Sequence, residues 1–354
     1  MMKNLIIKNL KQQYMYGAVG VRDISLECDS GEIISVLSHS EGGKTSLLKA
    51  IAGLYPILEG KIYIDGKDVT NLPPKDRNVL LVYEDGGFFN RKSVFYNLSY
   101  SLKIRKTSYD IIKDKVLSVA RELKIEHLLG EKIFRLSENE KVKVMIARAM
   151  LRKASVYLFD DPFKRVLPQD RHAVFIELLP FIKKLDGAVI FATTSVDEAR
   201  TISERTFIMS YGFVVDEGNF DDLYARPSTL TSYKFVKGYE SNIIKAKVSE
   251  DEEGVYIDIL NKKIKLSSDK LINPIYIGKE TIASFITYPA KEGIKHELGF
   301  LEYYNNRIIL HSKIDNHSIK TVIENKEDIP EYIDIDISSL KLFDINSEKL
   351  VYFD

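Results

Sequence analysis

The chain has 354 residues, of which 45% are hydrophobic and 29% are charged, which is typical of globular domains and enough for two of them. Lys plus Arg and Asp plus Glu number 51 each, so the net charge gives no reason to expect nucleic acid or an anionic membrane surface as a partner. The single cysteine, Cys28, excludes an internal disulfide and is typical of a reducing, cytoplasmic compartment.

The N-terminal stretch has no long apolar run, so we expect no signal peptide. No window of the sequence approaches the about 18 apolar residues that a membrane-spanning helix needs. A role at a membrane would therefore depend on another chain.

The first predicted elements surround a glycine-bearing loop. The segment GEIISVLS indicates a short apolar strand that ends at Ser38, and KTSLLKAIAGL indicates a helix that begins at Lys44 and ends at Gly53. Further along, SYDIIKDKVLSVARELKI predicts a helix with a capping box formed by Thr107 and Asp110. Its apolar stripe consists of Ile112, Val116, Val119 and Leu123.

Two later segments, ASVYLFDD and GAVIFATT, are almost entirely apolar, as expected for strands buried on both faces of a parallel sheet. After about Glu240 the pattern changes to short alternating runs. In YIDIDIS we expect Ile333, Ile335 and Ile337 to point to one side, and FLEYYNNRIILHSKI predicts a hairpin that turns at Asn305 and Asn306. The sequence therefore predicts an α/β domain followed by a small all-β domain.

The loop between the first strand and helix nearly matches the phosphate-loop pattern G-x-x-x-x-G-K-[ST]. In that pattern backbone N–H groups and the helix N-terminus bind phosphates, the lysine meets the outer phosphates and the hydroxyl ligates Mg²⁺. Here Ser38 replaces the first glycine, and Glu41 brings a carboxylate that repels a nearby phosphate charge by about 4 kcal/mol at about 4 Å and an effective dielectric near 20. The predicted nucleotide-binding residues of the loop are Ser38, His39, Ser40, Glu41, Gly42, Gly43, Lys44, Thr45 and Ser46.

The ordered series of segments resembles an ABC-transporter ATPase subunit, of the two-domain kind that drives importers of the maltose or glycerol-phosphate type. The segments are GKIYIDGKDVTNLPPKDRNVLLVYEDG, ARAMLRKASVYLFDDP, DEARTISERTFIMSYGFVVDEG, DDLYARPST and IDISSLKLFDINSEKL. The resemblance implies a P-loop NTPase (RecA-like) nucleotide-binding domain over residues 1–235, with a helical subdomain at about 86–152. It also implies a C-terminal accessory or regulatory domain over residues 236–354, built as an all-β, OB-like barrel.

The resemblance implies roles for individual residues, several of which depart from the family pattern. Tyr14 or Tyr16 would stack on adenine, and Thr45 with Asp160 would hold Mg²⁺. Three catalytic positions are changed: Glu84 stands for the Q-loop glutamine, Asp161 for the catalytic glutamate, and Thr194 for the switch histidine. The signature motif L-S-G-G-Q becomes Leu136 followed by the cross-dimer residues Ser137, Glu138, Asn139 and Glu140, and the D-loop reads Lys164, Arg165, Val166 and Leu167 without its aspartate.

These departures keep most groups that bind Mg-ATP and replace most groups that cleave it. One methylene less at Asp161 displaces the carboxylate, and a misplacement of about 1 Å can cost around a hundredfold in rate. The segment SENEKVK is also explained simply as a solvated helix start. Likewise, His39 is better explained as a solvated loop residue than as a catalyst.

Three functions remain open at this point. The first is a degenerate ATPase subunit of a sugar importer that binds ATP and Mg²⁺ with weak or no hydrolysis. It would pair with a more intact ATPase chain and dock on membrane-spanning subunits at the cytoplasmic face, with the aromatic segment DGGFFNRKSVFYNLSY as the docking surface. The second is an active homodimeric importer ATPase, and the third is a non-hydrolysing nucleotide-binding regulatory module. None of them requires nucleic acid.

Overall fold

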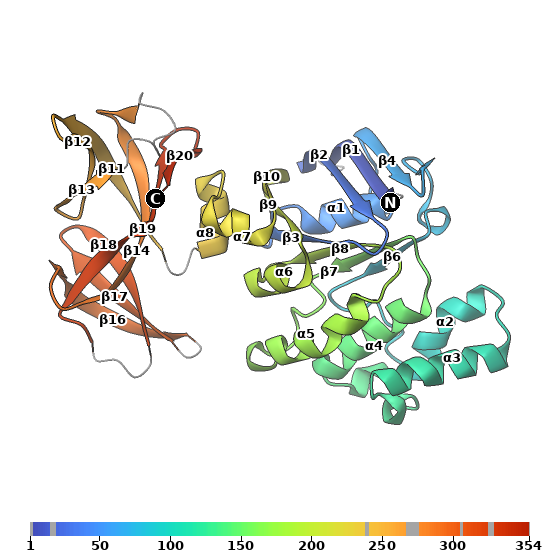
Figure 1. Cartoon of the computed structure of the whole chain (residues 1–354). Coiled ribbons are helices and arrows are strands. Elements are labelled where there is room, and N and C mark those ends of the chain that lie inside the picture. The colour runs from blue at the N-terminus through green and yellow to red at the C-terminus, as the bar shows by residue number, and fades with distance from the viewer. Residues whose placement is uncertain are drawn as a thin grey trace. The chain divides into compact units, whose positions relative to one another are not determined.

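A mixed sheet with β10 at one edge forms the centre of the first unit of the computed structural model (Figure 1). The structure describes residues 3–14, 19–237, 241–266, 276–304, 307–324 and 329–353. The strands of the central sheet are, in order, β10 (Phe213–Gly218), β9 (Arg205–Ser210), β3 (Ile33–Ser38), β8 (Ala188–Thr193), β7 (Val156–Asp160) and β6 (Val79–Val82). All neighbours pair in parallel except β10 with β9. Strands β7 and β8 are buried along their whole length, which confirms the prediction from their apolar sequences.

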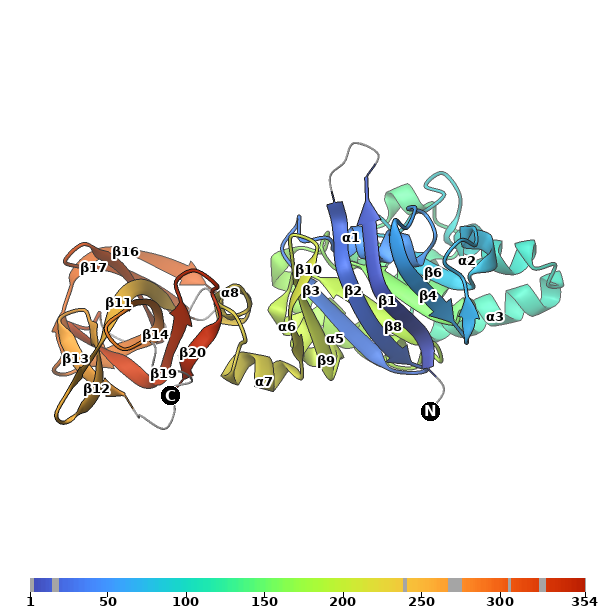
Figure 2. The same cartoon turned by 90° about the horizontal axis from the view of Figure 1, so that it is seen from above.

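An antiparallel sheet covers one side of this central sheet. Its order is β2 (Val19–Asp29), β1 (Lys3–Gln13), β4 (Glu59–Ile64) and β5 (Lys67–Asp68), and β1 and β2 run side by side as long strands (Figure 2). Helix α1 (Lys44–Ile51) packs between the two sheets, where Leu47, Leu48 and Ile51 join one hydrophobic core. The helix after the phosphate loop is thus held by both sheets.

Helices cover the other side of the central sheet (Figure 1). They are α4 (Glu138–Leu151), α5 (Pro168–Ile182) and α6 (Val196–Ile202). Helices α2 (Val94–Ile104) and α3 (Tyr109–Glu122) pack against α4 and each other, and short 3₁₀ turns lie at Pro74–Asp76, Glu126–Leu128 and Ile133–Arg135. The predicted stripe of α3 joins the core, but its predicted capping box is wrong. The helix begins at Tyr109, and its N-cap is Ser108, whose side chain makes no capping hydrogen bond.

The chain divides into two compact units, Met1–Asp221 and Asp222–Asp354. The division precedes the expected boundary at residue 235 because α8 (Leu230–Lys237) packs on the all-β part of the second unit. Leu230 and Tyr233 form a buried cluster with Phe343, and the rings of Tyr233 and Phe343 lie 5.6 Å apart. Helix α7 (Phe220–Ala225) contains the point of division.

The described strands of the second unit form two antiparallel sheets, as the predicted all-β domain requires. The larger contains β13 (Lys262–Leu266), β12 (Gly254–Ile259), β11 (Asn242–Asp251), β14 (Glu280–Ala290), β19 (Tyr332–Asp344), β15 (Ile294–Lys295) and β20 (Leu350–Phe353). The smaller contains β16 (Glu297–Tyr304), β17 (Arg307–Ile314) and β18 (His317–Glu324). The predicted turn at Asn305 and Asn306 lies outside the described residues, but the strands on either side of it pair antiparallel.

One predicted side-chain direction in β19 is wrong. Ile333 and Ile335 are buried as expected, but Ile337 is exposed. The ladder between β14 and β19 shifts register directly after Asp336, whose carboxylate accepts from the backbone N–H of Ser338 at 3.1 Å. A register shift ends strict alternation, so the third isoleucine turns outward.

Candidate nucleotide-binding site

The phosphate loop connects β3 to α1 through a backbone that requires two glycines. Gly43 has a φ of 103°, and a Cβ there would lie 2.5 Å from the carbonyl oxygen of Gly20. A Cβ on Gly42 would lie 1.6 Å from the hydroxyl of buried Ser38. Ser38, which replaces the first glycine of the pattern, therefore fits because Gly42 has no side chain.

The Lys44 ammonium lies inside this loop. It donates to the carbonyl oxygens of Ser38 at 2.7 Å and His39 at 3.0 Å, and the residue is only 4% exposed. Burial lowers the pKa of Lys44, while the nearby carboxylates of Asp161 and Asp160 act in the opposite direction. A buried lysine at the N-terminus of a helix, facing backbone groups of its own loop, is the arrangement that a phosphate binder needs.

Thr45 and Asp160 meet where α1 begins and β7 ends. The Thr45 hydroxyl donates to Asp160 Oδ1 at 3.0 Å, and burial raises the pKa of the Asp160 carboxyl despite that hydrogen bond. Within the described residues no group of three or more His, Cys, Asp and Glu side chains gathers as a metal site. Mg²⁺ in nucleotide sites is bound by one or two carboxylate or hydroxyl ligands together with phosphate oxygens, so this hydroxyl and carboxylate fit the predicted ion.

Asp161 and Thr194, two of the predicted catalytic positions, are brought together by the ends of β7 and β8. Asp161 Oδ1 accepts from the Thr194 N–H at 3.0 Å, and its Oδ2 lies 3.8 Å from the Lys44 Nζ. Asp161 is buried and has a φ of 48°, an uncommon backbone conformation for a residue with a side chain. Its carboxylate is thus fixed by a backbone amide and faces the lysine.

The third predicted catalytic position, Glu84, lies just after β6 and is paired with cations of the D-loop. Its carboxylate is 2.9 Å from Lys164 Nζ and 3.5 Å from Arg165 Nε. The pairing with Lys164 raises the pKa of that ammonium, with the hydrogen bond to Glu84 as the largest cause. The unusual carboxylate of the Q-loop is therefore paired with both unusual cations of the D-loop, a link that sequence reasoning did not find.

The signature positions form the first turn of α4. Ser137 is the N-cap, and Glu140 completes a capping box by accepting from both the N–H and the hydroxyl of Ser137 at 2.8 Å. Glu138 pairs with Lys141 at 2.6 Å, and Asn139 is partly exposed. The explanation as a helix start is confirmed, and the cross-dimer role of these residues stays a prediction.

The remaining loop residues differ in exposure. His39, Ser40, Glu41 and Thr45 are exposed, whereas Ser46 is buried. The exposed Glu41 is able to turn its carboxylate toward water, which reduces the repulsion of a bound phosphate.

The aromatic residues predicted to stack on adenine are only partly described. The hydroxyls of Tyr14 and Ser46 contact each other, and the Tyr14 ring lies edge-on to Tyr55 with 5.6 Å between the centroids. Tyr14 is 40% exposed, so part of its side chain is accessible to a ligand. Tyr16 lies outside the described residues. Stacking on adenine stays a prediction.

A partly buried ion pair next to Asp161 could not be predicted from the sequence. Arg171 of α5 donates from Nε to Glu198 of α6 at 2.6 Å, and Glu198 also accepts from the Thr193 hydroxyl at 2.6 Å. The Nη2 of Arg171 lies 3.9 Å from Asp161 Oδ1. Glu198 belongs to the segment DEARTISERTFIMSYGFVVDEG, but nothing in its spacing indicates the partner on α5.

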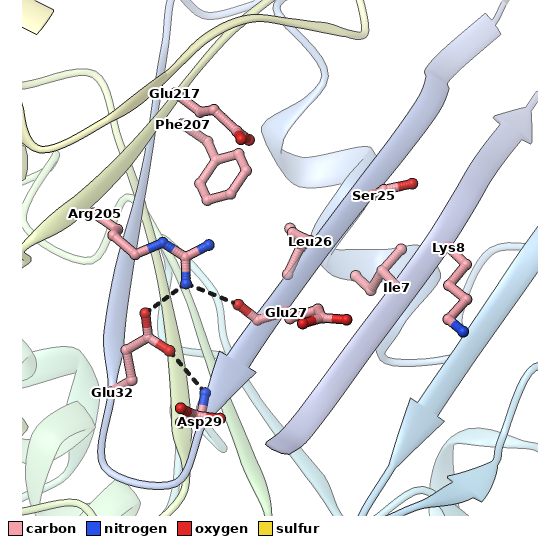
Figure 3. A pocket seen from close by; sticks show the side chains of 10 residues that line it. All are labelled: Ile7, Lys8, Ser25, Leu26, Glu27, Asp29, Glu32, Arg205, Phe207 and Glu217. Atoms are coloured by element: carbon pink, nitrogen blue, oxygen red, sulfur yellow. Dashed lines mark hydrogen bonds and ion pairs between the residues drawn. The ribbon is translucent and has the colours of Figure 1, made fainter. Parts of the chain in front are cut away.

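A concave region lies against β2 and β9 and has a volume of about 500 Å³ (Figure 3). Arg205 points toward the carboxylate of Glu32 at 2.8 Å and the carbonyl oxygen of Glu27 at 3.1 Å, and Glu32 also accepts from the N–H of Asp29 at 2.8 Å. These contacts tie the end of β2 to β9. None of the described residues predicted for the nucleotide site lines this pocket.

In the described part of the chain, no helix has both the length and the apolar character to cross a bilayer.

Comparison with known families agrees with this geometry. The family model "ABC transporter" matches residues 21–164. An uncharacterized ABC transporter ATP-binding protein, YurJ of Bacillus subtilis, is 25% identical over 100% of this chain and 98% of its own length. The trehalose/maltose import ATP-binding protein MalK of Thermococcus litoralis is 27% identical over 96% of this chain and 97% of its own length. The sn-glycerol-3-phosphate import ATP-binding protein UgpC of Yersinia enterocolitica is 33% identical, but the match spans only 65% of this chain and 64% of that protein.

Solved structures agree on the fold. The cbiO1 protein of Clostridium perfringens, part of the ABC transporter complex cbiONQ, has a TM-score of 0.57 at 23% identity, covering 64% of this chain and 92% of its own. A nucleotide-free ATP-binding cassette from an ABC transporter has a TM-score of 0.54 at 21% identity, covering 62% of this chain and 92% of its own. At these identities the likeness establishes the P-loop fold alone.

Proposed function

We propose that this chain is an ABC-transporter ATP-binding subunit of the sugar-importer family, and that it binds Mg-ATP tightly enough to couple it to membrane subunits while hydrolysing it weakly or not at all. The observation that carries this proposal is the contrast within one site. The binding group Lys44 and the pair of Thr45 with Asp160 have the geometry that a phosphate and a magnesium ion need. The groups that would assist cleavage are replaced or engaged elsewhere.

The proposed nucleotide site uses this chain's own groups in defined roles. Lys44 would exchange its two loop carbonyls for the outer phosphates, and the amides at the start of α1 would hold the same oxygens. Thr45 and Asp160 would hold Mg²⁺, which supplies the counter-charge for the triphosphate. Tyr14, with Tyr16 as the alternative, would support the adenine ring.

Three features support slow turnover. The Asp161 carboxylate is held by the N–H of Thr194 and is one methylene shorter than the family's glutamate, so it is poorly placed as a base. Thr194 cannot offer the imidazole of the family's histidine. Ser137 and Glu140 use their side chains to cap α4, and each missing transition-state donor costs about 3–4 kcal/mol.

The proposed assembly pairs this subunit with a second, more intact ATPase chain and with membrane-spanning subunits at the cytoplasmic face of the membrane. Sugar as the cargo is inferred from relatives named for the import of trehalose, maltose and glycerol phosphate. The aromatic segment supports a docking surface, because Phe89 is 43% exposed and its ring contacts Tyr96 edge-on and Tyr100 at a tilt, with 5.6 Å and 4.6 Å between the centroids. Phe88 and Phe95, by contrast, pack against the hydrophobic core.

The test is a paired measurement on the purified full-length chain. Binding of a fluorescent ATP analogue is titrated with and without Mg²⁺, and phosphate release is followed under the same conditions. We expect Mg²⁺-dependent binding that Lys44→Ala abolishes, with phosphate release close to background. Brisk hydrolysis that also depends on Lys44 would instead establish an active homodimeric ATPase. Binding that Lys44→Ala leaves unchanged would refute the proposed site.

A further inference from the structure

Two cations stand beside the phosphate site where the family pattern has none. Lys164 and Arg165 follow β7, and Glu84 follows its neighbour β6, so the ends of two adjacent parallel strands bring the three together. The three residues contribute one negative and two positive charges. Glu84 balances one of the two cations, and the carboxylates of Asp161 and Asp160 act on Lys164 from the side of the phosphate loop.

Lys164 is coupled to the phosphate loop through the backbone and through its charge. Its N–H donates to the carbonyl oxygen of Asp161 at 3.1 Å, and the Asp161 carboxylate lies 3.8 Å from Lys44 Nζ. The charge of Lys164 contributes to lowering the pKa of Lys44, and Asp161 and Asp160 contribute to raising the pKa of Lys164, after the larger effect of Glu84. The two lysines therefore act on the same small region.

The contact between Lys164 and Glu84 is easily exchanged. The side chains of Lys164 and Glu84 are 44% and 35% exposed, and ion pairs of such exposure are worth about 0–1 kcal/mol. A lysine ammonium on a flexible stem reorients without disturbing the backbone. A terminal phosphate carries more charge than a carboxylate and competes for the ammonium effectively.

We propose that Lys164 is a specificity-determining residue that binds the terminal phosphate of the triphosphate. Before the nucleotide binds, Glu84 pairs with the Lys164 ammonium. This inference rests on the proposed nucleotide site and deepens it. On binding, the Lys164 ammonium leaves Glu84 for the γ-phosphate, and Arg165 remains to pair with the Glu84 carboxylate. ADP lacks the γ-phosphate oxygens that Lys164 would bind, so this lysine makes the site bind ATP in preference to ADP.

The experiment measures dissociation constants of MgATP and MgADP for the full-length chain and for Lys164→Met. A hydrogen bond to a charged group is worth about 1.5–3 kcal/mol, so we expect MgATP binding to weaken at least about tenfold while MgADP binding stays within about twofold. Glu84→Gln should tighten MgATP binding a few-fold because it removes the competing partner. That gain should vanish in the double variant Glu84→Gln, Lys164→Met.

Lys262→Met is the matched control, because Lys262 pairs with Asp334 at 2.6 Å with side-chain exposures of 36% and 27% in the second unit. It should leave both dissociation constants unchanged, and thermal unfolding verifies that every variant is folded. An unchanged ratio of MgATP to MgADP affinity in folded Lys164→Met would overturn the inference and leave the nucleotide site intact. Failure of the wild-type chain to bind either nucleotide would instead overturn the proposed function.

Discussion

Replacing Gly43 by alanine tests the geometry on which the phosphate loop depends. The substitution keeps a φ of 103°, which costs a residue with a Cβ about 1–2 kcal/mol. It also places that Cβ 2.5 Å from the carbonyl oxygen of Gly20 and 3.1 Å from the Cα of Gly212, both of which are backbone atoms that cannot rotate away. Overpacking of this kind costs about 1–3 kcal/mol. The sum predicts a loss of about 2–5 kcal/mol in the free energy of unfolding.

Gly31→Ala provides the matched control, because Gly31 has a φ of 76° but a Cβ there would meet nothing within 4 Å. It should lose only the conformational part, about 1–2 kcal/mol. For a unit of this size, 1 kcal/mol shifts the unfolding midpoint by about 2–4 °C, so calorimetry should give a fall of about 10 °C for Gly43→Ala and about 4 °C for the control. Equal shifts in the two variants would refute the close approach of the loop to Gly20. Gly43→Ala should also lose ATP binding, and Gly31→Ala should retain it.

Three other substitutions or reactions have defined outcomes. Asp161→Glu should raise the rate of phosphate release roughly tenfold, because it returns the carboxylate toward the position of a base, and an unchanged or lower rate would count against misplacement as the cause of slow turnover. Phe89→Glu should abolish co-purification with the membrane subunits, whereas Phe300→Glu, at another exposed ring in the second unit, should not; retention of the partner by Phe89→Glu would contradict the docking surface. Burial raises the pKa of the Cys28 thiol from 9.0 to about 12, so at pH 9 the thiol should be alkylated only when the chain unfolds. Rapid alkylation of the folded chain would disprove its burial. Because the unfolded thiol loses its proton first, the contribution of Cys28 to stability is present below pH 9.0 and declines as the pH rises toward about 12.

The parts of the fold that follow from local pattern could be predicted. Apolar runs predicted the buried strands β7 and β8, and a glycine-bearing loop between strand and helix predicted the site around Lys44. The meeting of Thr45 with Asp160 followed from the family resemblance rather than from spacing. Each of these predictions depends on residues whose role is fixed by their own segment or by a known motif.

The parts that depend on contacts distant in sequence could not be predicted. Nothing near Glu84 indicates that its partners are Lys164 and Arg165, because the pairing arises only when β6 and β7 become neighbours. Ile337 turned outward because of a register shift set by β14, a different strand. The two units divide earlier in the chain than expected because Tyr233 packs on Phe343, which lies far away in the sequence.

The contact of Ser38 with Gly42 constrains the order in which this loop could have lost its first glycine. A side chain at position 42 would meet the Ser38 hydroxyl at 1.6 Å, and rotation of that hydroxyl would still leave the Ser38 Cβ and the Met209 carbonyl oxygen at 3.0 Å. Serine at position 38 is therefore accommodated without strain when position 42 carries glycine. Glycine at position 38 would remove the contacts with Ser38 but leave the Met209 carbonyl oxygen at 3.0 Å, so the effects of substitutions at positions 38 and 42 depend on each other.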